Sequence, residues 1–66
     1  MFKVQEFYCE DTPVDEDIRE AMIYANTHNC VVKITTWFSP PTCLMVSEYI
    51  FPNENFEVVC DRFKYF

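Results

Sequence analysis

The sequence predicts an α+β domain in the order β-α-β-β-β, with one helix packed on a four-stranded, largely antiparallel sheet. Three observations support this fold class. A helix-start signature near Pro13 precedes an apolar stripe with helical spacing, three later segments are rich in Val, Ile and aromatic residues, and short turn-forming segments connect them. Residues 1–66 are expected to form one small domain, because a chain of this length buries only roughly 60% of its unfolded surface.

The helix is expected from Pro13 to about Thr27. Thr12 suits the N-cap, Pro13 suits the first helical position because its missing N–H costs nothing there, and the acids that follow complement the helix dipole. Asn29 suits the C-terminal cap, since asparagine tolerates the left-handed conformation. An apolar stripe is expected to face the sheet, with residues at i, i+4, i+7, i+8 and i+11: Val14, Ile18, Ala21, Met22 and Ala25.

Four segments have the composition of β-strands. They span residues 2–9, 30–38, 43–51 and 56–65. Turn-forming residues at 39–42 and 52–55 join the last three, and connections of this length suit antiparallel neighbours. We therefore expect the last three strands to form a meander, while the position of the first strand in the sheet is left open.

Charge restricts the kinds of partner. Eleven Asp and Glu oppose five Lys and Arg, so the net charge is −6. Binding to nucleic acid or to an anionic membrane requires clustered Lys and Arg, so neither is expected. Glycine is absent, which excludes glycine-rich phosphate-binding loops. A protein partner with a basic surface is the partner that this charge favours.

The four cysteines lack the CxxC spacing of a strong zinc-site motif. They are Cys9, Cys30, Cys43 and Cys60. Buried free thiols are the favoured interpretation, and a zinc site or paired disulfides remain alternatives. The first residues carry charges and no apolar signal-like core, and no run reaches the length of a membrane span, so a cytoplasmic protein is expected.

Catalytic groups are sparse. His28 is the single histidine, and its place near the predicted helix end suits a dipole-stabilising role. Six carboxylates crowd the helix start, where solvated acids are ordinary: Glu10, Asp11, Asp15, Glu16, Asp17 and Glu20. We therefore predict no enzyme activity, no catalytic residues, no metal site and no cofactor.

One candidate partner-binding surface lies on the predicted helix. On a helical wheel, Glu16, Glu20, Ile23 and Thr27 share the face opposite the apolar stripe, and Tyr24 lies beside them. Ile23 is then an exposed apolar residue within an acidic patch. It is interpreted either as an ordinary exposed side chain or as a hot-spot residue ringed by charge.

A second candidate surface lies on the sheet, whose strands are apolar on both alternating sides. One helix covers only one face, and the other face of an antiparallel sheet is normally polar. The residues left over are Trp37, Met45, Tyr49 and some of Phe56, Phe63, Tyr65 and Phe66. Six residues are predicted to bind a partner: Glu16, Glu20, Ile23, Tyr24, Trp37 and Tyr49. The two sheet residues among them, Trp37 and Tyr49, belong either to an exposed patch or to a homodimer interface.

In size and charge the chain resembles small accessory proteins of bacteriophages and other mobile elements. The resemblance implies inhibition of a host polymerase, nuclease or defence protein in the host cytoplasm, with the helix acids imitating phosphates. The predicted function is thus an acidic protein-binding module that occupies a basic surface. The alternatives are a small zinc-binding or redox-active cysteine protein, and a structural subunit that self-associates through an aromatic sheet face.

Overall fold

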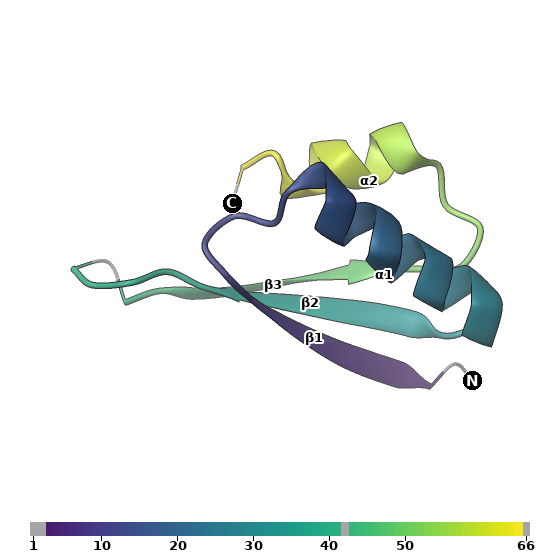
Figure 1. The fold of residues 1–66 in the computed structure, drawn as a ribbon, viewed down its shortest axis with the longest axis horizontal. Helices are drawn as coiled ribbons and strands as arrows, with labels where there is room; N and C mark the ends of the chain where they lie inside the picture. Colours follow the sequence, from purple (N-terminus) through teal and green to yellow (C-terminus); the bar gives the residue numbers. More distant parts are fainter. Residues whose placement is uncertain (1–2, 42, 66) are drawn as a thin grey trace.

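The computed structural model describes residues 3–41 and 43–65 as two layers, with two helices on one face of a three-stranded sheet (Figure 1). Strands and helices follow one another as β1 (Val4–Glu10), α1 (Asp15–His28), β2 (Val31–Trp37), β3 (Met45–Ile50) and α2 (Phe56–Phe63). The β-α-β-β part of the prediction is therefore present, each boundary lying within two residues of the expected one.

The sheet is mixed, with strand order β1-β2-β3. β1 pairs with β2 in parallel, Val4 lying opposite Val31, and β2 pairs with β3 antiparallel, Val32 lying opposite Ile50. Parallel neighbours require a long crossover, and α1 provides it. The central position of β2 explains why it is the most buried strand.

The predicted four-stranded sheet with one helix is wrong, because the segment expected as a fourth strand forms α2 instead. Asn55 caps this helix: its side chain accepts hydrogen bonds from the backbone N–H groups of Glu57 at 2.8 Å and Val58 at 3.4 Å. Apolar residues recur at i, i+3 and i+7, and the last two, Val59 and Phe63, are buried. The Val and Phe content of this segment suggested a strand, but its buried side chains, Val59 and Phe63, are four residues apart, as on one face of a helix.

The start of α1 differs from the prediction, and its end agrees with it. Val14, not Thr12, holds the N-cap position, and its N–H donates to the Asp17 carboxylate at 3.3 Å. Pro13 consequently precedes the helix and is buried. Asn29 adopts the expected left-handed conformation, with φ 49° and ψ 53°, at the C-cap.

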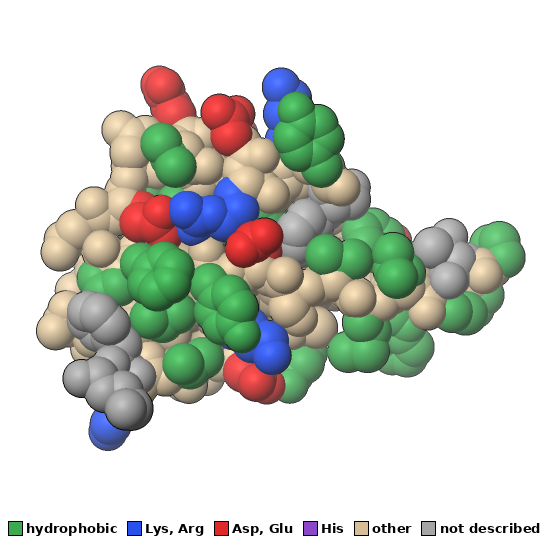
Figure 2. Space-filling model, turned by 180° about the vertical axis from the view of Figure 1, so that it is seen from behind, with side chains coloured by type: hydrophobic (Ala, Val, Ile, Leu, Met, Phe, Trp, Pro, Cys, Tyr) green, Lys and Arg blue, Asp and Glu red, His purple; other side chains and the backbone are tan. Residues whose placement is uncertain are grey.

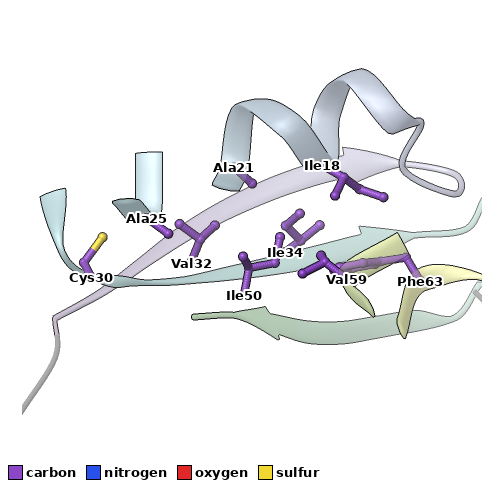
Figure 3. Close-up of a cluster of buried hydrophobic side chains, with 9 residues drawn as sticks. All are labelled: Ile18, Ala21, Ala25, Cys30, Val32, Ile34, Ile50, Val59 and Phe63. Atoms are coloured by element: carbon purple, nitrogen blue, oxygen red, sulfur yellow. The ribbon is translucent and has the colours of Figure 1, made fainter. Parts of the chain in front are cut away.

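The core lies between the helices and the sheet, and its buried side chains come mainly from α1, β2, β3 and α2, with Phe7 and Cys9 of β1 packed against them (Figure 3). Its members are Ile18, Ala21, Ala25, Cys30, Val32, Ile34, Ile50, Val59 and Phe63. The helical stripe predicted for α1 therefore faces the sheet, except that Val14 at the N-cap is exposed. Thr36 is also fully buried, and its hydroxyl has no hydrogen-bond partner among the described residues.

Arg62 of α2 forms an ion pair with Glu54 of the β3–α2 loop and a hydrogen bond with the end of β3. Arg62 donates from Nη1 and Nη2 to the Glu54 carboxylate, at 2.8 and 2.5 Å, and also from Nη1 to the Tyr49 carbonyl at 2.6 Å. Glu54 in turn accepts from the Phe51 N–H at 2.7 Å. The hydrogen bonds from the Arg62 guanidinium hold the pKa of the Glu54 carboxyl below its usual range, because they favour the ionised form.

The β2–β3 hairpin projects beyond the helices as an arm (Figure 1). From Ile34 to Ser47 the sequence contains no charged residue. Hydrophobic side chains gather along this arm (Figure 2), where Trp37, Leu44 and Met45 are exposed.

Candidate interaction surfaces

The predicted partner-binding residues lie on two opposite sides of the molecule. Four belong to α1, which covers one face of the sheet; Trp37 and Tyr49 lie on the strands and point to the other face. The orientation of the sheet residues follows from alternation, since their neighbours Thr36 and Ile50 are buried against the helices. The structure therefore separates the six residues into two surfaces.

The helical surface consists of Glu16, Glu20 and Ile23 of α1, together with Met22 and Phe56 beside them. Ile23 is 64% exposed. Both glutamates are exposed on the same helix face, one and two turns before Ile23.

A shallow groove adjoins Ile23 where α1 and α2 meet. It has a volume of about 420 Å³ and is lined by Arg19, Met22, Ile23, Asn26 and Phe56. The Arg19 guanidinium lies over the Phe56 ring, 4.7 Å from its centroid, a cation–π contact. The helical surface thus combines an apolar groove, one engaged cation and flanking carboxylates.

α2 adds acidic residues to this side of the molecule, which the sequence prediction missed. The Cys60 thiol lies 4.0 Å from the Asp15 carboxylate, so the two helices meet near the start of α1. Partial burial, with the nearby carboxylates of Asp15, Asp61 and Glu57, raises the pKa of the Cys60 thiol, while Arg19 opposes the shift. The helical spacing of the apolar residues within 56–63 was the signal that could have placed Glu57 and Asp61 on a helix.

Tyr24 differs from the other predicted partner-binding residues because it is half-buried. Its ring contacts Phe7 edge-on, with centroids 5.3 Å apart, and lies 4.1 Å from the His28 ring. Its hydroxyl is 3.5 Å from the Gln5 side-chain oxygen. These contacts connect α1 to β1, and His28 accordingly lies at the helix end as predicted.

The open sheet face is the side of the sheet that the helices do not cover. Its side chains alternate with those of the core along each strand. It comprises Val4, Glu6, Tyr8 and Glu10 of β1, Val31, Lys33, Thr35 and Trp37 of β2, and Met45, Ser47 and Tyr49 of β3. Tyr8 is 70% exposed, Trp37 60%, Met45 63% and Tyr49 40%. The prediction of apolar residues on both sides of the sheet is thus confirmed for the strands. It is wrong for Phe56 and Phe63, which belong to α2, and for Tyr65, which follows α2, while Phe66 lies outside the described residues.

Polar groups at the centre of the open sheet face interact with one another. Lys33 lies 3.8 Å from the Glu6 carboxylate and 6.0 Å from the Tyr49 ring centroid. The Tyr8 hydroxyl donates to the same carboxylate, and this hydrogen bond is the main reason that the Tyr8 pKa is raised. The Thr35 and Ser47 hydroxyls are 3.0 Å apart. The polar centre of this face is therefore hydrogen-bonded and ion-paired internally.

The four cysteines are free thiols that differ in burial and position. Cys30 is buried, Cys9 and Cys60 are half-buried, and Cys43 is exposed on the hairpin. Within residues 3–41 and 43–65, no group of three or more His, Cys, Asp or Glu side chains is placed to hold a metal ion. The four-cysteine zinc site kept as an alternative is not formed in this structure.

Searches of protein families, curated proteins and solved structures find no match to the chain. No helix in the described part of the chain is long and apolar enough to cross a membrane. Fold and surfaces together define a small two-layer α+β protein, βαββα in order, with an acidic helical side and an aromatic sheet side.

Proposed function

We propose that this chain is a protein-binding module whose helical surface binds a basic surface of a partner protein. The observation that carries the proposal is the exposed Ile23, which borders an apolar groove and shares its helix face with Glu16 and Glu20. An apolar anchor surrounded by charged residues is the composition of an interface hot spot with its rim.

The chemistry of the helical surface defines the partner segment. Lys or Arg side chains of the partner pair with the carboxylates, and an apolar side chain enters the groove between Met22 and Phe56. Its volume of about 420 Å³ has room for one or two side chains. The net charge of −6 accelerates encounter with a basic partner and makes the association rate depend on salt.

Proteins that handle nucleic acid present the basic surfaces that such a module fits best. On this proposal the carboxylates of α1 take the place of phosphates, and the module inhibits its target by competing with nucleic acid. The target is a host nucleic-acid-handling or defence protein, in keeping with the resemblance in size and charge to bacteriophage accessory proteins. The four free thiols suit a reducing compartment such as the cytoplasm.

A capture experiment with charge-matched variants tests the proposal. Immobilised wild-type protein is compared with Glu20→Lys and with Glu10→Lys, which changes the net charge equally but lies on the open sheet face. Any captured protein is purified and its Kd measured. We expect Glu20→Lys to weaken binding at least tenfold and Glu10→Lys to leave it within about twofold.

Salt and nucleic acid provide the second readout. Binding is expected to weaken between low and high salt, and duplex DNA is expected to compete with the module for its target. The proposal fails if the combined replacement of Glu16, Glu20 and Ile23 by Gln, Gln and Ser leaves capture unchanged. It also fails if Kd is the same at both salt concentrations.

A further inference from the structure

We propose that the open sheet face is a homodimer interface, on which a second copy of this chain packs with two-fold symmetry. The inference is independent of the helical surface, which lies on the other side of the molecule. A two-fold interface brings the same patch of both copies together, so a single apolar face is sufficient for self-association.

The exposed aromatic area is large for so small a protein. Tyr8, Trp37 and Tyr49 are 70%, 60% and 40% exposed, and at 150–250 Å² per aromatic side chain they present roughly 250–400 Å². Val4 and Met45 extend this area along the face. A stable interface buries about 800 Å² per partner, so the three aromatic side chains supply roughly a third to a half of the area that a dimer requires, and the other exposed residues of the face supply the rest.

The distribution of charge selects a second copy as the occupant. The whole chain carries a net charge of −6, but the open sheet face has only Glu6, Glu10 and Lys33, a net of −1. Two copies repel each other least when these faces meet and the acidic helical surfaces point outward. A basic partner, by contrast, finds more negative charge on the helical side.

Most polar groups at the centre of this face already have a partner within it. Lys33 is paired with Glu6, and the Thr35 and Ser47 hydroxyls bond to each other. Burial of an already satisfied group avoids the penalty of roughly 1–3 kcal/mol for an unpaired one. Glu10 lies on the edge strand β1, where an interface rim stays hydrated.

Trp37, the single tryptophan, is a built-in reporter of this interface. We expect its fluorescence emission to shift to shorter wavelength as the wild-type protein is concentrated from micromolar to millimolar. The mass from sedimentation equilibrium should double over the same range. A monomer mass and an unchanged emission throughout that range would overturn the proposal.

Two lysine substitutions at similarly exposed sites distinguish the interface from the rest of the surface. Met45→Lys adds a charge to the open sheet face and keeps the tryptophan, while Val58→Lys makes the same charge change on α2. If the substitution in each copy weakens the affinity about tenfold, Met45→Lys raises the dimer Kd about a hundredfold, because both copies carry the change. Val58→Lys should stay within about threefold of wild type, and equal effects of the two variants would contradict the assignment.

Salt dependence separates this proposal from the binding of a basic partner. Self-association is expected to strengthen from 0.05 M to about 0.5 M NaCl, since screening reduces the repulsion between two acidic copies. Binding through the helical surface is expected to weaken over the same range. A dimer that dissociates with added salt would refute the proposed interface, whatever the outcome of the capture experiment.

Discussion

Two neighbouring valines in α2 provide a direct test of how this helix packs. Val59 is fully buried and Val58 is 54% exposed, although both lie on the same helix. Val59→Ala removes two carbons from the core, which costs about 1.6 kcal/mol in transfer free energy, plus a cavity term. Alanine recovers about 0.5 kcal/mol in helix propensity at either position. With a cavity term of about 1 kcal/mol, the expected net loss at Val59 is therefore about 2 kcal/mol.

Such a loss is large for this chain, because a 66-residue domain is expected to have a free energy of unfolding of only about 3–10 kcal/mol. Urea unfolding followed by circular dichroism measures it, and the melting temperature should fall by about 8–16 °C. Val58→Ala is expected to leave stability unchanged or raise it by about 0.5 kcal/mol, because Val58 is exposed and alanine has a higher helix propensity than valine. If Val58→Ala destabilises the protein as much as Val59→Ala, the assignment of α2 is wrong.

Three further predictions concern single polar groups. Asn55→Ala should cost about 1 kcal/mol by removing the cap of α2, whereas Asn55→Asp should retain most stability; equal losses in thermal unfolding would contradict the cap. Glu54→Gln should cost about 1 kcal/mol at pH 7. Because the Glu54 pKa is lowered on folding, this stabilisation exists above the unfolded pKa near 4.5 and is lost as pH falls through the folded value. The stability difference from wild type should therefore vanish in urea titrations at pH 2–3 and persist at pH 7. Thr36→Val should raise stability by about 1 kcal/mol, because it removes a buried hydroxyl without a partner among the described residues; a loss in urea unfolding would indicate a partner.

Local signals were sufficient for the first four elements. The Val, Ile and aromatic content around Val32 and Ile34 predicted β2, and Asn29 marked the end of α1, because both signals depend on residues close in sequence. The N-cap was misplaced because Thr12 has the preferred side chain, but the helix starts after Val14. Residues 56–65 were predicted as a strand because they are rich in Val and Phe, although their apolar residues have helical spacing.

The candidate surfaces were partly predictable for the same reason. Exposure of Ile23 follows from the helical wheel, and exposure of Trp37 follows from strand alternation. The groove was not predictable, because Phe56 reaches Met22 and Ile23 only after α2 packs against α1. Side-chain partners such as Lys33 and Glu6 likewise depend on the register between strands.

The sequence by itself determined the acidic charge, the amphipathic α1 and the alternating apolar strands, because these depend on composition and short-range periodicity. Only the tertiary structure decided that β1 pairs in parallel with β2, that the last segment is a helix, and that both helices cover the same face of the sheet. Pairing of distant strands and burial of one helix against another are long-range contacts, and their free energy outweighs the local β-propensity of Val and Phe. The uncovered aromatic face, on which the dimer proposal rests, results from that packing.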